Sequence, residues 1–266
     1  MPSPTRIDGR KGGRFYDVPE VGECPSVTNI LSVISKPALV PWAARVEREL
    51  VVEAAAALYM DAPTSPRMTK AGYVTSLIQR LGHERAHEKQ LRKAGDIGSE
   101  CHRLVEWNLR LKSGQKVGDQ PIVSPAAATA FSSFSQWWGE SGLQVLAIEQ
   151  TVWHPLLRYA GTLDILAYQG QDLVLVDLKT SRAIYDEYAL QVAAYIKAMD
   201  AMGHGPVQRG YIVRLPKADG DGFEVLGLSD VDRSFEAFEH AFALWKWQQK
   251  QGESYAHNPS ENGTAA

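Results

Sequence analysis

The chain has 266 residues, a formal net charge of −3 and 44% hydrophobic residues. This length allows one large domain or two small ones, and the apolar content is sufficient for a packed core. The charge balance excludes a chain that is basic throughout, so any contact with nucleic acid must come from local patches.

The two cysteines and the apolar segments indicate which cellular compartment the protein is suited to. Cys24 and Cys101 are too few for the four thiolates of an iron–sulfur cluster, so we expect none. A disulfide between them is an open alternative to the simpler expectation of a reduced, cytoplasmic protein. The N-terminus lacks the apolar region of a signal peptide, and no apolar run approaches the ~20 residues of a membrane span.

The N-terminal third predicts a short hairpin followed by helices. Residues 14–18 and the segment around Cys24 favour two strands, and Ser26 or Thr28 can cap a helix that follows Pro25. Pro41 suits the first turn of a second helix. A turn-rich break at 61–66 precedes helical patterning from about 69 to 94.

Basic residues are frequent late in this helical region, among acids: Arg80, Arg85, Lys89, Arg92 and Lys93. Mixed charges of this kind are typical of a solvated helix face. The alternative is a track for the backbone of a nucleic acid.

The next helix carries a histidine next to an apolar face. Ile97, Cys101 and Leu104 recur at helical spacing, and Gly114 ends the pattern. His102 and Glu106 are i,i+4 neighbours, so the residues alone favour an ordinary pair or a surface histidine.

A helix over 125–140 and a strand over 143–153 follow, the latter containing Glu149. Two more strands come next, around the turn Gln169-Gly170-Gln171-Asp172. A symmetric hairpin with this centre places Leu166 opposite Leu175 and Asp164 opposite Asp177. Carboxylates set face to face repel each other, so a divalent cation with oxygen ligands is the natural occupant between them.

Strand alternation adds a third charged group. Asp177 and Lys179 are two residues apart and point to the same face, whereas Leu178 points to the other. A simple ion pair at a strand end is the alternative interpretation. The surrounding run Leu173–Val176 is apolar, and an idle charge in such a strand would be costly.

The remaining elements complete an α/β order. A helix runs to about Met202, capped by Thr180 or Ser181, and shares one face among Tyr188, Gln191, Tyr195 and Ala198. A strand over 208–215, an edge strand over 223–228 and a helix over 231–250 follow. The final helix has an aromatic stripe, Phe235, Phe238, Phe242 and Trp245.

Three motifs together carry a resemblance. Gly161-Thr162-Leu163-Asp164, then Asp177-Leu178-Lys179, then Gln191-Val192-Ala193-Ala194-Tyr195 resemble the PD-(D/E)XK nuclease superfamily. Within it the chain is most similar to RecB-like exonucleases, including the phage and mitochondrial genome maintenance types. The likeness covers about residues 95–200. The resemblance implies a mixed central sheet flanked by helices, with an added N-terminal helical layer.

The resemblance also implies a site. The segment Gly98 to His102 matches one whose histidine joins the two acids as a metal ligand. His102, Asp164, Asp177 and the Leu178 carbonyl would then hold one or two Mg²⁺ or Mn²⁺ ions, with Glu149 beside the ligands or among them. Glu100 and Glu106 are alternative ligands. Catalysis would use Lys179, Asp177 and Asp164, supported by Gln191 and Tyr195. We expect burial next to a cation to lower the pKa of Lys179, with the two aspartates opposing this.

The expected function is therefore metal-dependent hydrolysis of DNA, by an exonuclease acting on single strands or duplex ends. The implied processes are recombination, repair or phage DNA processing, in a bacterial or phage setting, and any protein partner is undefined. The alternatives are an inactive DNA-binding or assembly module of the same fold, or an enzyme acting on RNA or another phosphate ester. We expect residues 1–94 to form part of a DNA cleft, 95–252 the nuclease core, and 253–266 a disordered tail.

Overall fold

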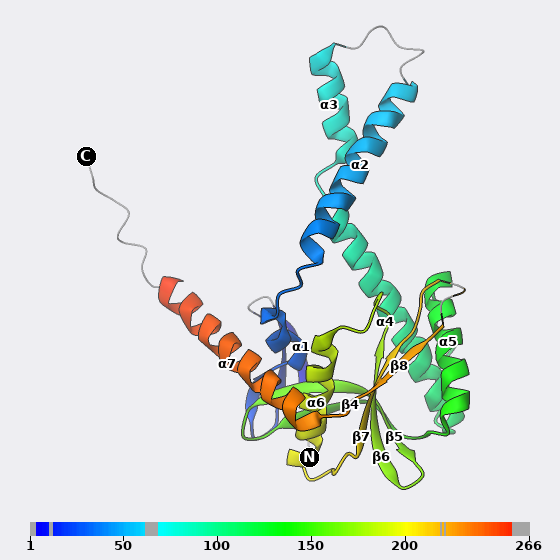
Figure 1. Ribbon diagram of the computed structural model, residues 1–266, viewed down its shortest axis with the longest axis vertical. Coiled ribbons are helices and arrows are strands. Elements are labelled where there is room, and N and C mark those ends of the chain that lie inside the picture. The colour runs from blue at the N-terminus through cyan, green and yellow to red at the C-terminus, as the bar shows by residue number, and fades with distance from the viewer. Residues whose placement is uncertain (1–3, 11–12, 62–68, 219, 221, 257–266) are drawn as a thin grey trace, which may run out of the picture. The chain divides into compact units, whose positions relative to one another are not determined.

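The computed structural model describes residues 4–10, 13–61, 69–218, 220 and 222–256 (Figure 1). The chain forms two compact units: Met1–Ile34 with Gly98–Ala266, and Ser35–Ile97. The N-terminal strands thus group with the main sheet, whereas the expected division at residue 94 grouped them with the helices that follow. The physical reason is that β2 and β3 contact β5 of the main sheet.

A mixed five-stranded sheet forms the centre of the larger unit. Its strands are β4 (Gln144–His154), β5 (Tyr159–Gln169), β6 (Asp172–Lys179), β7 (Arg209–Arg214) and β8 (Glu224–Gly227), in that spatial order. Only β6 and β7 pair in parallel within it. Residues Leu173–Leu178 of β6 are all buried, as expected for a central strand covered on both faces. The predicted α/β class with a mixed, helix-flanked sheet is confirmed.

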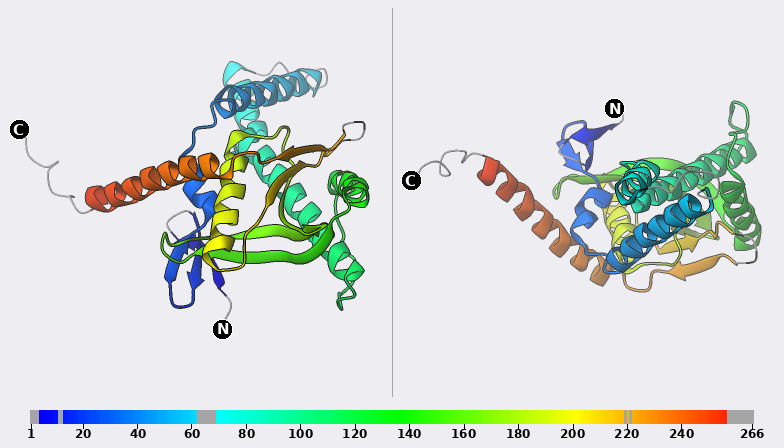
Figure 2. Two further views of the ribbon diagram at one scale, coloured as in Figure 1. Left: turned by 60° about the horizontal axis from the view of Figure 1, so that its bottom comes forward. Right: turned by 90° about the horizontal axis from the view of Figure 1, so that it is seen from above.

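Two helices follow the sheet strands and cover the main core. α6 (Asp186–Ala201) runs across β4, β5, β6 and β7 (Figure 2), and α7 (Val231–Ala256) packs on α6. Phe238, Phe242 and Trp245 of the predicted stripe are buried, and Phe235 is partly buried against them. The expected cap of α6 is wrong: the helix begins at Asp186, four residues later than a Ser181 cap would place it, and its N-cap residue Tyr185 makes no side-chain capping bond.

The histidine helix and its successor precede the sheet. α4 (Ala86–Lys112) buries Cys101, Leu104, Val105 and Leu109, but Leu111 is exposed. Gly98 lies within α4, where a Cβ would come within 3.0 Å of the Thr180 hydroxyl, so the helix passes close to the end of β6. α5 (Pro125–Ser141) has Ser124 as its N-cap and ends at Gly142 with φ +67°.

A small three-stranded antiparallel sheet adjoins β5. It consists of β1 (Thr5–Arg10), β2 (Gly13–Val18) and β3 (Gly22–Pro25), so the predicted hairpin is present with an added strand. The short helix α1 (Val27–Ile30) and the 3₁₀ turn η1 (Leu31–Val33) follow. The Ser26 hydroxyl accepts a bond from the Asn29 amide at 3.0 Å, which identifies Ser26 as the cap.

The second unit is helical. α2 (Leu39–Asp61) packs against α3 (Lys70–Leu81), and the first residues of α4 also belong to it. The predicted continuous helix from 69 to 94 is two helices, because the chain turns at Gly82 with φ +69°. Of the predicted turn at 61–66, residues 62–66 lie outside the described residues.

Several of the basic residues in this unit are paired with acids. Arg85 lies 3.2 Å from Glu88, and Arg92 pairs with Glu84. These exposed ion pairs agree with a solvated helix face, and a role in DNA binding stays a prediction.

Two further expectations concern the C-terminal tail and the membrane. α7 continues to Ala256, past the expected boundary at 252, and the rest of the predicted tail lies outside the described residues. Within the described part of the chain, no helix combines the length and apolarity that crossing a membrane requires.

Candidate active site

The β5–β6 hairpin has the predicted register over most of its length. Leu166 pairs with Leu175, and the ladder ends at Ile165 and Val176. The expected pairing of Asp164 with Asp177 is therefore not part of this ladder. Asp164 Oδ2 instead accepts a bond of 2.7 Å from the Leu178 amide, one residue beyond Asp177. The regular pairing of the two strands thus ends just before their carboxylates, and a side-chain bond takes its place.

Asp164 is held by the helix that precedes the sheet. His102 Nδ1 on α4 lies 3.2 Å from Asp164 Oδ1, while the other carboxylate oxygen is bound by the Leu178 amide. Both oxygens of Asp164 therefore have a partner, and the orientation of the carboxylate is fixed. The contact that the backbone of Leu178 makes is through its N–H, and the ligand role of its carbonyl stays a prediction.

Asp177 is held by α6, the helix that follows β6 in the chain. Its Oδ1 accepts a 2.9 Å bond from Gln191 Nε2, and its Oδ2 lies 2.6 Å from Lys179 Nζ. Gln191 also accepts from Lys179 Nζ at 3.3 Å and donates to the Tyr195 hydroxyl at 3.2 Å. The structure thus joins the predicted residues Asp177, Lys179, Gln191 and Tyr195 in one bonded network.

Glu149 completes a cluster of possible metal ligands. One ligand atom each from His102, Glu149 and Asp164 lie within 4.8 Å of one another. Glu149 sits on β4 between Ile148 and Gln150, which pair with Ile165 and Leu163 on either side of Asp164. Its φ of +51° is unusual for a residue other than glycine, and such strain is found most often at functional sites.

The charges of this cluster shift one another. Burial disfavours protonated His102, but the Asp164 carboxylate outweighs this and raises the pKa of His102 to about 9. For the acid Asp164 burial acts in the opposite direction and would raise the pKa, but His102, Lys179 and the Leu178 amide hold it below its ordinary value. Burial, together with the neighbouring Asp164, raises the pKa of Glu149 to about 7.

Burial and the two aspartates act on the pKa of Lys179 in opposite directions. Burial would lower the pKa of Lys179, but Asp177 and Asp164 outweigh burial and raise it. The two aspartates thus oppose a lowering, as expected, with Asp177 only 2.6 Å from the amine, and the lowering expected next to a bound cation stays a prediction. Burial raises the pKa of Asp177 to about 6, although Lys179 opposes the shift. Lys179 is accordingly a charged ammonium at neutral pH.

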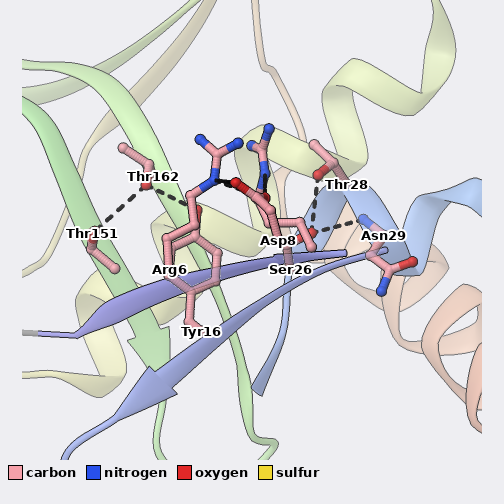
Figure 3. Close-up of polar contacts among 9 residues, drawn as sticks. Arg6, Asp8, Tyr16, Ser26, Thr28, Asn29, Thr151 and Thr162 are labelled. Atoms are coloured by element: carbon pink, nitrogen blue, oxygen red, sulfur yellow. Dashed lines mark hydrogen bonds and ion pairs between the residues drawn. The ribbon is translucent and has the colours of Figure 1, made fainter. Parts of the chain in front are cut away.

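A chain of hydroxyl groups connects β4, β5 and β2 (Figure 3). Thr162 is two residues before Asp164, and its hydroxyl is 3.5 Å from that of Thr151, its pairing partner on β4. The buried Tyr16 of β2 places its hydroxyl 3.0 Å from Thr162. The small N-terminal sheet is therefore bonded directly to the strand that carries Asp164.

The alternative ligands are used elsewhere. Glu100 accepts bonds from the amide and hydroxyl of Ser124 at the start of α5, and Glu106 pairs with Arg110 at 2.9 Å. Tyr188, which helical spacing places on the same face as Gln191, has its ring centroid 4.9 Å from Lys179 Nζ.

The donor set fits a divalent cation. Carboxylate oxygens suit Mg²⁺ and Mn²⁺, and an imidazole nitrogen is compatible with Mn²⁺. The carboxylates of Asp164 and Glu149 are close together and partly withdrawn from solvent, which favours a cation between them. His102 must give up its proton to serve as a ligand, since only the neutral ring offers a nitrogen lone pair.

Comparison with known proteins finds similar chains among solved structures. No protein-family model and no curated protein matches this sequence. The chain is similar to a crystal structure of LHK-Exo in complex with dAMP, with 13% identity, a TM-score of 0.38, and coverage of 55% of this chain and 77% of that one.

Two further solved structures are similar at the same level. An alkaline exonuclease (LHK-Exo) from Laribacter hongkongensis gives 12% identity and a TM-score of 0.31, over 61% of this chain and 92% of that one. The structure of SSO0001 gives 13% identity and a TM-score of 0.28, over 64% of this chain and 86% of that one.

Proposed function

We propose that this protein is a metal-dependent nuclease of the PD-(D/E)XK type, related to RecB-like exonucleases, that hydrolyses phosphodiester bonds of DNA. The observation that carries the proposal is the convergence of two carboxylates and one ammonium at the end of the β5–β6 hairpin. Each charged group is held by a hydrogen bond with an element other than its own: Asp164 of β5 with β6, and Asp177 and Lys179 of β6 with α6. An ion pair without a function does not require such support.

The ligand residues in the proposal are His102, Asp164 and Glu149, with Asp177 adjacent. A bound Mg²⁺ or Mn²⁺ would lower the pKa of a coordinated water and offset the negative charge that grows on the phosphate. Glu149 is thus proposed as a ligand itself, because its carboxylate shares the space between His102 and Asp164.

The protein's own groups position the reactants. Lys179, as an ammonium, can donate to a phosphate oxygen or to the attacking water, and Asp177 and Gln191 fix its amine. The raised pKa favours this orienting role over removal of a proton by Lys179. Gln191 is itself fixed by Tyr195, so a chain of bonds extends from α6 to the reacting centre.

The test is digestion of end-labelled and circular DNA, single- and double-stranded, and of an RNA strand of matched sequence, with Mg²⁺, with Mn²⁺ and with EDTA. We expect degradation of the linear substrates only with metal, and a loss of roughly 100-fold or more in Lys179→Ala. Lys116→Ala, which changes an exposed loop lysine, is the matched control and should keep the wild-type rate.

Three results would contradict parts of the proposal. Wild-type cleavage rates in Lys179→Ala would remove the assigned role of the lysine. Rapid cutting of circular DNA would replace exonuclease by endonuclease action. Cleavage of RNA alone, or binding of DNA without cleavage under any metal, would instead support the alternative functions.

A further inference from the structure

An exposed tyrosine contacts the tyrosine ring that packs against Lys179. Tyr185 is the residue before α6, and 42% of its surface is exposed. Its ring meets the Tyr188 ring nearly edge-on, with centroids 5.6 Å apart, and Lys179 Nζ lies 4.9 Å from the centroid of Tyr188. Two short contacts therefore separate an exposed aromatic ring from the ammonium at the reacting centre.

The segment that presents this ring is fixed. The Ser181 hydroxyl donates to the Ala183 carbonyl at 2.7 Å, and Ile184 packs against the main core. The Tyr185 carbonyl accepts a bond of 3.0 Å from the Tyr188 amide. Because these contacts set the backbone before any ligand arrives, a molecule that stacks on the ring does not have to order the segment first.

The charges nearby decide what kind of group can stack there. Asp186 and Glu187 follow Tyr185 directly in the chain, in the first turn of α6, and Asp186 is exposed. An exposed carboxylate this close along the chain disfavours a phosphate over the ring, whereas an uncharged, flat nucleobase meets no such penalty. Every base has a π-face, so stacking on tyrosine accepts any sequence.

We propose that Tyr185 is a stacking platform for an unpaired nucleobase next to the scissile phosphate, which makes a single-stranded end the substrate of this site. The inference rests on the proposed nuclease function for the position of the phosphate. A base inside a duplex is already stacked and paired, so it must leave the helix before it can use the ring.

The experiment uses the full chain and single-stranded oligonucleotides with 2-aminopurine at successive positions from each end. Ca²⁺ replaces Mg²⁺, since it binds oxygen ligands and allows binding to be measured under conditions chosen to show no cleavage. We expect quenching of the 2-aminopurine at one position in wild type, retained in Tyr185→Phe and lost in Tyr185→Ala. Tyr168→Ala is the matched control, because Tyr168 is 41% exposed but lies at the C-terminal end of β5, next to the turn at Gly170.

An abasic nucleotide at the quenched position gives a second readout. Wild type should lose affinity by about 10-fold on the abasic strand, and Tyr185→Ala should lose as much on the intact strand but nothing further on the abasic one. Additive losses, or equal quenching in wild type and Tyr185→Ala, would overturn the proposal. A similar loss in Tyr168→Ala would also do so.

The outcome is distinguishable from a failure of the nuclease assignment. Cleavage of linear DNA by wild type with Mg²⁺ or Mn²⁺ is measured separately and does not depend on Tyr185 stacking. Position-specific quenching without any cleavage would leave the platform standing and remove the catalytic function, and cleavage without position-specific quenching would do the reverse.

Discussion

At Gly161, β5 and α6 approach each other so closely that there is no space for a side chain. A Cβ at this position would overlap the ring of Tyr195. The glycine of the Gly161–Asp164 motif is therefore required by space, because the tyrosine that supports Gln191 occupies the place of its side chain.

Replacing this glycine tests the role of Tyr195. We expect Gly161→Ala to push the Tyr195 ring away, to weaken its bond with Gln191, and to cost about 1–3 kcal/mol of unfolding free energy. DNA cleavage should fall further than the lost stability explains, which denaturant titration and cleavage rates measured together will show.

The matched control is Gly139→Ala. An added Cβ there meets no atom within 4 Å, and the position lies inside α5. This change should be neutral or stabilise the protein by roughly 0.5–1 kcal/mol. Equal effects of the two substitutions would contradict the argument from close approach.

The clustered charges predict how stability depends on pH when no metal is bound. The pKa values of His102, Glu149 and Asp177 are raised to about 9, about 7 and about 6. A raised folded-state pKa gives stability that is present below the unfolded-state pKa and lost as pH rises through the folded value. Asp164 acts in the opposite sense, but only at acid pH, since its pKa is lowered from 3.8.

We therefore expect the Tm of the metal-free protein to fall between about pH 5 and pH 9. Asp164→Asn removes the carboxylate that raises the pKa of His102, so the upper part of this fall should flatten in the variant. Thermal unfolding in EDTA at several pH values is the measurement, and a constant Tm across the range would contradict the charge assignment.

At the scale of elements, α7 packs against both α6 and Tyr159 of β5, and so stabilises the contact between the sheet and α6. Tyr159 of β5 is fully buried, and its hydroxyl donates to the Ala194 carbonyl of α6 at 2.9 Å. Phe238 of α7 meets the Tyr159 ring with centroids 4.9 Å apart. The final helix thus stabilises the same β5–α6 contact that positions Gln191 and Tyr195.

Truncation of this anchor should be costly. Phe238 has no exposed surface, so Phe238→Ala is expected to lose about 3–5 kcal/mol of unfolding free energy. Leu244→Ala on the same helix, at a side chain that is 45% exposed, should change it by less than about 0.5 kcal/mol. Urea titrations of both variants check this, and a small loss in Phe238→Ala would mean that α7 does not anchor the core.

At the scale of the whole molecule, the reactivity of the two thiols measures how readily the core of the larger unit opens to solvent. Cys24 and Cys101 have no exposed surface and are not joined in a disulfide. Burial raises the pKa of Cys24 to about 11 and that of Cys101 to about 12, so neither forms a thiolate near neutral pH.

Native protein should therefore leave both thiols unreactive toward Ellman's reagent, and guanidinium should expose both. A reduced protein is also the expectation from the sequence. If one thiol reacts quickly under native conditions, the strand β3 or the helix α4 that carries it must open without global unfolding.

The sequence by itself determined the features that depend on near neighbours. The turn at Gly170 and the alternation along the chain predict the pairing of Leu166 with Leu175 and the shared side of Asp177 and Lys179. Helical spacing likewise predicts that Gln191 and Tyr195 lie together. These features follow from the period of the backbone, which is fixed within a few residues.

Only the tertiary structure decided how the separate segments meet. The bond from the Leu178 amide to Asp164, the approach of His102, and the shared space with Glu149 join four elements, α4, β4, β5 and β6. The platform at Tyr185 also depends on where α6 begins, which the capping pattern predicted wrongly. Such contacts depend on how helices and strands pack across a core, and short-range sequence patterns do not contain that information.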